Sequence, residues 1–396
     1  MGSFPGARSP DADGFDEVSF GSSRPPGRGR PGWLLIAAGA AVIVVIVVVS
    51  VAVSGHKHKP STASVARPPA PAVQPVPSVS DVGRHLLGVA AGWDLVGYSP
   101  GQVVRIEFAQ GRIERTTVPE LLSSGPLSLV VGPRQVIIRP LDFVPGYLVP
   151  DGHPARSLSG VLSHGGTLIP GPWPGTAWYQ SGYQARSLLL VWMDGTKTGT
   201  SLRLPHGGVQ VIPDGRGYAL ALGVRTGELH DVSPQGVRRI TGTLAAVGPA
   251  SWLIVQCHHR HCSDVVVNSA TGARHVLPGQ VASPASAPPS IGGPGAIAPD
   301  GSAAALLRVG PGGQVTLHLL SLMNGRDHRI DVSLEDQGSA SAQMLAWSPD
   351  SRWLFVVDAN GTIAVVNART EHIENIGVNM PPASMIAIRN SPSASQ

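Results

Sequence analysis

Charged residues, lysine and cysteine are all scarce in this chain of 396 residues. Asp, Glu, Lys and Arg together make up 14%, which is too low a charge content for a typical disordered chain. The chain has only 3 Lys and 2 Cys, and neither cysteine lies near the long apolar run described below. The absence of a cysteine at that run excludes a lipoprotein anchor.

The body of the chain also lacks net charge. The formal total is +4, but residues 33–67 alone carry +3 and residues 1–32 balance four Arg against four acidic residues. This leaves +1 for the remaining 329 residues. A domain so close to neutral has no basic surface for nucleic acid, and we expect no nucleic-acid partner.

Turn-forming residues are abundant instead. The 49 Gly and 37 Pro make up about 22% of the chain, against an average of about 12%. No long helical period appears, whereas short β-rich runs alternate with turn signals through residues 82–390. Composition and patterning together argue against a helical protein and for an all-β fold.

One apolar run, Trp33–Val53, contains no charged residue over 21 positions. As a helix rising about 1.5 Å per residue it would span about 31 Å, the thickness of a bilayer's hydrocarbon core. We therefore predict a single transmembrane helix over residues 33–54, in contact with membrane lipid. The alternative is a signal peptide cleaved after Ala52-Val53-Ser54, although the run is longer than the apolar core of such peptides.

The segments beside this run indicate its orientation. Three Arg precede it and two Lys follow it closely, so the positive-inside rule alone gives nearly a tie. Residues 55–81 form a Pro-rich linker, which is typical of an extended spacer that lifts a domain off the membrane. We expect a single-pass protein of the cell membrane, with residues 1–32 as a disordered cytoplasmic tail and the main domain extracytoplasmic.

Internal repetition organises residues 82–390. The clearest unit, Leu345–Ile373, contains three apolar strands, a Ser-Pro-Asp-Ser turn and an Asn360-Gly361 hairpin typical of a type I′ turn. Seven such units of about 44 residues fit this span. A unit of about 44 residues has the length of a four-stranded propeller blade. The repetition predicts a seven-bladed β-propeller. Other recognisable copies of this unit begin at Val211, Leu244 and Ala296.

The turn Trp347-Ser348-Pro349-Asp350, followed by an apolar strand and a Gly hairpin, resembles the repeats of TolB-like and WD40-like propellers. Partial copies occur at Ile212–Gly215 and Ala298–Gly301, and the TolB-like variety fits better. With its span and Pro-rich stalk, the chain is also similar to membrane-anchored propeller proteins of actinobacteria. That resemblance implies no particular activity.

The ends of the repeat region are expected to meet. The first unit, from Trp93, has room for only three strands, and the apolar run Ala383–Ile388 can supply the fourth. A ring closed by strands from both ends leaves no free sheet edge. Residues 391–396 are expected to be a disordered tail.

Cys257 and Cys262 flank a His-rich hairpin, Cys-His-His-Arg-His-Cys. Opposed residues of a hairpin lie within disulfide reach, and closing so small a loop stabilises by about 2 kcal/mol. We predict a disulfide, which indicates an oxidising compartment. Free thiols and a zinc site with the neighbouring His are the alternatives, and ligands crowded on one turn disfavour zinc. No metal or other cofactor is expected.

Aromatic residues crowd the third unit at Trp173, Trp178 and Tyr179, beside Pro-Gly-Pro-Trp-Pro-Gly. They are our candidate binding surface for a sugar or peptide, and the alternative is that they fill the gap between blades.

Four acidic residues follow Pro in tight turns, where local turn chemistry explains them. The alternative is a set of carboxylates at one mouth of the propeller that binds a cation or a basic peptide. These residues are Asp151, Asp214, Asp300 and Asp350.

No motif in the sequence supplies a complete set of catalytic residues. Gly97–Gly101 matches Gly-x-Ser-x-Gly, but Pro100 lacks the N–H that an oxyanion hole needs. Gly27–Gly32 matches a dinucleotide motif, but no strand precedes it. We expect no enzyme but an extracytoplasmic scaffold that binds an envelope protein or glycan. A hydrolase or lyase with its site at the channel mouth, and a ligand sensor signalling through the transmembrane helix, are the alternatives.

Overall fold

The computed structural model describes most of the chain between residues 77 and 390. Described are residues 77–90, 92–119, 121, 127–140, 146–258, 261–281, 294–309, 314–334, 342–378 and 380–390. The chain divides into Met1–Pro71 and Ala72–Gln396, and all described residues belong to the second unit. The expected span at Trp33–Val53 and both expected tails lie outside the described residues. Within the described part, no helix is long and apolar enough to cross a membrane.

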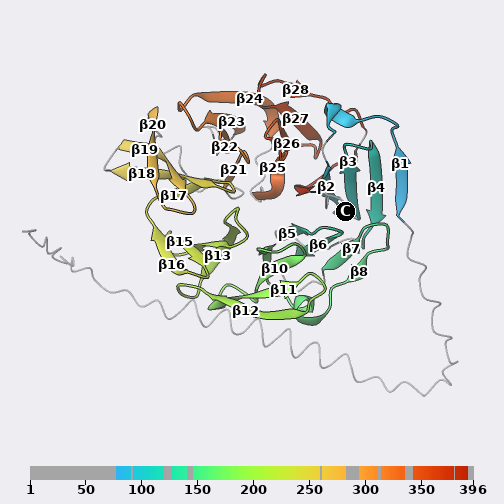
Figure 1. The fold of residues 1–396 in the computed structure, drawn as a ribbon, viewed down its shortest axis with the longest axis horizontal. Helices are drawn as coiled ribbons and strands as arrows, with labels where there is room; N and C mark the ends of the chain where they lie inside the picture. Colours follow the sequence, from blue (N-terminus) through green and yellow to red (C-terminus); the bar gives the residue numbers. More distant parts are fainter. Residues whose placement is uncertain are drawn as a thin grey trace, which may run out of the picture. The chain divides into compact units, whose positions relative to one another are not determined.

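The described residues form an all-β structure with short 3-10 helices η2 (Leu86–Gly88), η3 (Gly160–Ser163) and η5 (Ala342–Met344). The strands belong to six hydrogen-bonded sheets: one of five strands, four of four strands and one of eight. Figure 1 shows the sheets side by side around a common centre, the arrangement of a β-propeller. The all-β propeller fold expected from the repeats is therefore confirmed.

The first sheet is built from both ends of the described chain. Its strands are β1 (Ser78–Asp81), β2 (Trp93–Ser99), β3 (Gln102–Glu107), β4 (Arg112–Thr117) and β29 (Met385–Asn390), in the order β1-β4-β3-β2-β29. β29 pairs antiparallel with β2, so the expected closure by the C-terminal run is confirmed. β1, from the end of the segment expected as linker, pairs with β4 and adds an outer strand.

Four further sheets have four strands each, in sequence order. They are β5 (Leu127–Val131), β6 (Gln135–Pro140), β7 (Tyr147–Pro150) and β8 (Arg156–Ser157); β9 (Thr167–Pro170), β10 (Thr176–Gln180), β11 (Ser187–Trp192) and β12 (Lys197–Arg203); β13 (Val209–Pro213), β14 (Ala219–Gly223), β15 (Leu229–Ser233) and β16 (Gly236–Ile240); and β25 (Leu345–Trp347), β26 (Trp353–Val357), β27 (Ile363–Asn367) and β28 (Ile373–Glu374).

The eight-stranded sheet joins two antiparallel halves. Its strands are β17 (Thr243–Val247), β18 (Ser251–His258), β19 (His261–Asn268), β20 (Arg274–Val281), β21 (Gly295–Ile297), β22 (Ala303–Val309), β23 (Val315–Ser321) and β24 (Asp327–Leu334). The halves meet where β17 runs parallel to β21. Hydrogen bonding thus divides the described residues into six sheets, whereas seven separate blades were expected.

The hairpin between β26 and β27 differs from the expected type I′ turn, which needs a positive φ at both central residues. Gly361 has φ 76°, but Asn360 is not among the described non-glycine residues with positive φ. Asp358 N donates to Thr362 O at 2.8 Å, which leaves a three-residue loop. The Asp358 carboxylate accepts hydrogen bonds from Asn360 N and Thr362 N, and these fix the longer loop.

The hydrophobic core fills the spaces between neighbouring sheets. Successive residues of a strand point to opposite faces, so Leu95 packs toward the β25–β28 sheet and Val96 toward the β5–β8 sheet. Trp93 and Phe108 stack at 4.5 Å between ring centroids, and Phe355 lies 5.5 Å from Phe108. A charged side chain on a strand covered on both faces, such as Asp94 on β2, is therefore buried between two sheets.

Candidate functional site

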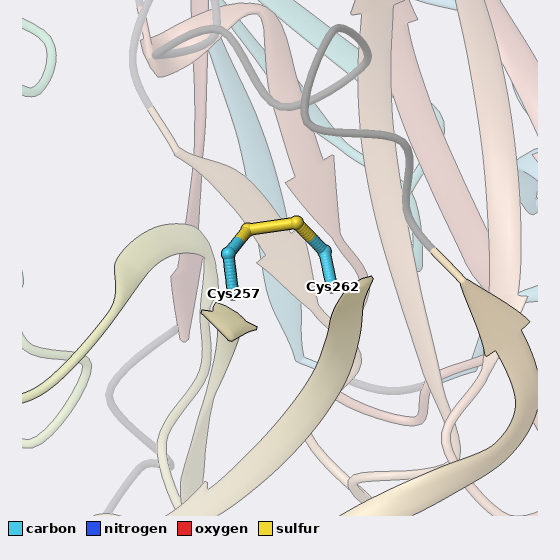
Figure 2. The surroundings of a disulfide bond; sticks show 2 residues. All are labelled: Cys257 and Cys262. Carbon is cyan, nitrogen blue, oxygen red and sulfur yellow. A yellow bond between two sulfur atoms is a disulfide. The ribbon is translucent and has the colours of Figure 1, made fainter. Parts of the chain in front are cut away.

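The two cysteines form the predicted disulfide (Figure 2). Cys257 lies directly opposite Cys262 in the β18–β19 hairpin, with their Cα atoms 3.9 Å apart. Cys257 is exposed, whereas Cys262 is only 1% exposed. Across the described residues, no group of three or more His, Cys, Asp or Glu is placed to hold a metal ion.

The three aromatic residues of the candidate binding surface do not come together on one exposed surface. Trp178 and Tyr179 are 1% and 4% exposed, and they pack on opposite faces of β10. Trp178 Nε1 donates to Gly217 O at 2.8 Å, and Tyr179 Oη donates to Gly165 O at 2.9 Å. Adjacent residues of a strand covered on both sides are both buried, which corrects the expectation for these two.

Trp173 alone of the three is well exposed, at 52%. Trp192, at the end of β11, is 44% exposed and belongs to the same sheet. Thr176 connects them, because it pairs with Trp192 in the ladder and its N–H donates to Trp173 O at 3.1 Å. Trp173, Trp192 and Tyr183, in the loop between β10 and β11, are thus the large aromatic side chains of this unit that are exposed among the described residues.

Three of the four turn aspartates stabilise their own turns. Asp214 accepts from the backbone N–H groups of Arg216 and Tyr218, both at 2.8 Å. Asp300 accepts from Ser302, and Asp350 accepts from the Arg352 N–H. These contacts support the turn interpretation for these residues.

Asp151 behaves differently, because its carboxylate reaches across to the first sheet. There it joins a set of charged residues that we call the Arg105 cluster. The cluster consists of Asp94, Arg105, Glu107, Glu114, Asp151 and Arg389.

Strand register places the Arg105 cluster on one face of the first sheet. Asp94 lies opposite Arg389 of β29 and Glu107 of β3, and Arg105 lies opposite Glu114 of β4. Directly opposed residues point to the same face, so these five side chains all face the β5–β8 sheet. Asp151 follows β7 of that second sheet, which explains how the two sheets share the cluster.

Arg105 is the centre of the cluster, with contacts to four carboxylates. Its Nε lies 2.9 Å from Asp94 Oδ2, and its Nη2 lies 3.0 Å from Glu107 Oε1. Its Nη1 lies 3.4 Å from Glu114 Oε2 and 3.2 Å from Asp151 Oδ2. Glu114 Oε1 also accepts from Gly152 N at 2.6 Å. Such a shared guanidinium holds all four carboxylates in a fixed geometry.

Arg389 is the second guanidinium of the cluster and is almost fully buried. It donates to Asp94 Oδ2 from Nε and Nη2 and to Asp151 Oδ1 from Nη1, at 2.8–3.1 Å. Burial acts to lower the pKa of Arg389, but its hydrogen bonds to Asp151 and Asp94 outweigh burial and raise the pKa. Four carboxylates against two guanidinium groups leave the cluster with a formal charge of −2.

A pocket of about 460 Å³ opens beside the cluster. Its lining combines Asp94, Arg105, Glu107 and Asp151 with residues of neighbouring turns, namely Ala109, Gln110, Pro133 and Arg134, and with Gly92 and Trp93. Within the described part of the chain, Glu107 Oε2 has no hydrogen-bond partner, although Glu107 is only 7% exposed. A free carboxylate oxygen in a pocket wall accepts a hydrogen bond from a ligand's N–H or O–H group.

Sequence reasoning missed this cluster, apart from Asp151. The signal was present, because β2 and β3 read Trp-Asp-Leu-Val and Val-Val-Arg-Ile-Glu. A charge in an otherwise apolar strand must find a partner when both faces are buried. The partner of Asp94 is Arg389, 295 positions away, so the pairing depends on how the ring closes.

No protein-family model and no curated protein sequence matches the chain. Among solved structures it is similar to TolB from Acinetobacter baumannii, with 14% identity, a TM-score of 0.40, and 75% of this chain and 82% of that chain covered. It is similar to the Cps50 (Swd1) β-propeller domain of Myceliophteria thermophila, with 10% identity, a TM-score of 0.39 and coverages of 64% and 87%. It is also similar to virginiamycin B lyase from Staphylococcus aureus, with 11% identity, a TM-score of 0.43, and 66% of this chain and 87% of that chain covered.

These neighbours include TolB and a WD40 propeller, the two kinds of protein whose repeats the sequence resembles. Likenesses of 10–14% identity with TM-scores below 0.5 assign no activity, substrate or partner to this chain.

Proposed function

We propose that this β-propeller is a non-catalytic binding module, and that the pocket beside the Arg105 cluster contacts its partner, an envelope protein or glycan. The observation that carries the proposal is Glu107 Oε2, which no described residue pairs with, in the wall of a pocket of about 460 Å³. The rest of the cluster is already paired, so it supplies a rigid frame in which this oxygen is preorganised.

The pairing within the cluster favours binding over catalysis. A general acid or base must be able to exchange its proton with a substrate. Asp94 and Asp151 are instead tied to both arginines, and Glu114 is held by Arg105 and by Gly152 N. These contacts position carboxylates well but leave them little freedom to transfer protons.

The second candidate is a hydrolase or lyase, and one observation favours it. Glu107 is a buried carboxylate that faces the pocket with a free oxygen. If this group performs chemistry, Glu107→Gln will bind the ligand but leave it unconverted. A non-catalytic pocket will return the ligand unchanged from the native protein as well.

The experiment that tests the binding role is site-specific photocrosslinking in intact cells. A photoreactive amino acid at Gln110, which is exposed and lines the pocket, is expected to give a defined adduct. Glu107→Gln should reduce this adduct at least tenfold. The matched control places the photoreactive group at exposed Arg225, away from the pocket. The same adducts at both positions, or an adduct insensitive to Glu107→Gln, would contradict the proposal.

We also propose that the ring has seven blades. The two halves of the eight-stranded sheet are joined by only two residue pairs, Ala246 with Gly295 and Val247 with Ala296. Each half is itself an antiparallel set of four strands. Counted separately, the halves and the other five sheets make seven units, with β1 as an extra edge strand.

We propose that the propeller faces the outside of the cell membrane, anchored by Trp33–Val53. The Cys257–Cys262 disulfide supports this, because disulfides persist mainly in oxidising compartments. The test is labelling of whole cells with a membrane-impermeant maleimide. Labelling of both cysteines only after reduction is expected. Labelling that requires cell lysis but no reductant would place the domain in the cytoplasm.

A further inference from the structure

We propose that the Cys257–Cys262 disulfide is a thiol–disulfide exchange site that accepts electrons from a dithiol. In this proposal Cys257 is the sulfur attacked, and Asp264 donates the proton that Cys262 takes up. The site is separate from the pocket beside the Arg105 cluster and does not depend on its function.

The first support is the unequal exposure of the two cysteines. Cys257 lies at the exposed end of β18 beside exposed His258, whereas Cys262 is 1% exposed. Figure 2 shows the bridge between the tips of the two strands. Exchange requires an incoming thiolate to reach one sulfur while the other departs. The exposures select Cys257 for attack and Cys262 as the leaving group.

The second support is that strand pairing holds the hairpin on its own. β18 and β19 are in continuous register from Ser251 opposite Asn268 to His258 opposite His261, eight pairs in all. The cysteines are the second-last pair of this ladder, next to the pair His258–His261 at its turn end. Opening the bridge therefore leaves the hairpin intact, as a reversible site requires.

The third support is a buried carboxyl with one oxygen that no described residue pairs with. Asp264 is 3% exposed, and in the described part of the chain its Oδ2 has no hydrogen-bond partner. An unpartnered buried polar group destabilises a fold, so it needs an explanation. Asp264 lies two residues after Cys262 on the same face of β19, and at about 3.3 Å per residue the Cα atoms are about 6.6 Å apart. The Asp264 carboxyl and the Cys262 side chain therefore lie next to each other along one face of β19.

The groups around Asp264 act on its pKa in both directions, and the balance raises it. Burial raises the pKa of Asp264, the charge of Arg308 on β22 lowers it, and the charge of Asp327 on β24 raises it. Asp327 is itself engaged, because Arg308 Nη1 lies 3.0 Å from its Oδ2 and His318 Nδ1 on β23 lies 2.9 Å from its Oδ1. Asp264 is thus the carboxyl that is both unpartnered and held toward its protonated form.

The proposed reaction balances in two steps. A thiolate of the dithiol attacks Cys257 Sγ, the Cys257–Cys262 bond breaks, and its electron pair goes to Cys262 Sγ. Asp264 then protonates Cys262 and recovers a proton from solvent. The second thiolate of the dithiol attacks the dithiol's own sulfur in the mixed disulfide, which releases Cys257 as a thiolate that takes a proton from solvent. The protein gains two electrons and two protons, and the dithiol leaves as its oxidised cyclic disulfide.

The first experiment locates the attacked sulfur. The full chain, kept in mild detergent, is treated with glutathione, a monothiol that traps the mixed disulfide because it lacks a second thiol. Peptide mass spectrometry then maps the adduct after the free cysteine is alkylated. Glutathione is expected on Cys257, with at least a tenfold excess over Cys262. Equal adducts, or an adduct mainly on Cys262, would overturn the proposed direction of attack.

The second experiment measures how fast dithiothreitol reduces the bridge in Asp264→Asn at pH 7. If Asp264 donates the proton, the rate falls at least tenfold. If Asp264 is an ionised bystander, removing its charge makes departure of the Cys262 thiolate easier, and the rate rises. An unchanged or faster rate therefore overturns the role of Asp264. Ser263→Ala, on the opposite face of β19, is the control and should react at the native rate.

Discussion

Arg389 donates two hydrogen bonds to one oxygen of Asp94, from Nε at 3.1 Å and from Nη2 at 2.8 Å. Both side chains are 3% exposed. The pair joins β29 to β2, the two strands at which the end of the described chain returns to its first unit. A buried charge pair therefore reinforces the seam of the ring.

Removing the cation of this pair is expected to destabilise the fold strongly. Arg389→Met removes one of the two guanidinium partners of Asp94 and Asp151, and breaking a buried pair costs about 3–5 kcal/mol. Urea unfolding at pH 7 measures this loss. The control is Arg326→Met, because Arg326 makes an exposed pair with Glu371. Its replacement should lower the free energy of unfolding by less than about 1 kcal/mol. Similar losses of unfolding free energy in both variants would show that the buried pair stabilises the fold no more than an exposed pair does.

Arg139 is the opposite case, a buried arginine that no carboxylate of the described residues contacts. It is 1% exposed, its Nε and Nη1 have no hydrogen-bond partner in the described part of the chain, and it lies over the Tyr179 ring at 5.2 Å. Burial lowers the pKa of Arg139. Arg139→Met keeps most of the volume and removes the charge, so the free energy of unfolding should rise by about 1–3 kcal/mol. A loss of stability on urea unfolding would show that the charge is compensated.

Asp327→Asn is expected to weaken the fold at neutral pH but not in acid. Burial acts to raise the pKa of Asp327, but the hydrogen bond from His318 and the charge of Arg308 outweigh it and lower the pKa. A lowered pKa stabilises the folded state above the unfolded-state value, about 4, and this contribution is lost as pH falls through the folded value. Urea midpoints from pH 7 down to pH 2 should therefore converge with the native protein's. A constant offset would exclude an ionic origin.

Asp264→Asn should show the reverse trend. Burial raises the pKa of Asp264, so the folded state favours the protonated carboxyl. The protonated carboxyl therefore stabilises the fold at low pH, and this stabilisation is lost as pH rises through the pKa of the folded state. The variant should match the native protein near pH 3 and exceed it in stability by pH 8. The same urea series measures this. A variant less stable than the native protein at pH 8 would mean that the Asp264 carboxylate has a stabilising partner.

Two tryptophans of one sheet should respond very differently to truncation. Trp178→Ala removes a side chain that is 1% exposed, together with its hydrogen bond to Gly217, and should cost about 3–5 kcal/mol. Trp173→Ala removes a side chain that is 52% exposed and should change stability by less than about 0.5 kcal/mol. Thermal unfolding of the two variants checks this. Equal losses would contradict the division between core and surface at this sheet.

Local patterns in the sequence were sufficient for the class of fold. Alternating apolar strands and Gly- or Asp-containing turns depend on neighbours in the chain, so the all-β repeats could be predicted. The disulfide could also be predicted from the sequence, because hairpin geometry brings Cys257 opposite Cys262. The closing strand β29 was predictable because an incomplete first unit would leave a sheet edge unpaired.

What the sequence by itself determined about this protein is therefore its strands, its turns and the chemistry available in each repeat. Only the tertiary structure decided which residues meet between sheets. Trp178 and Tyr179 looked exposed in a Pro- and Gly-rich segment but are covered by two different sheets. Asp151 looked like a turn residue but is paired with Arg389, 238 positions away. The physical reason is that burial and ion pairing arise between strands that are distant in sequence, and closure of the ring sets their neighbours.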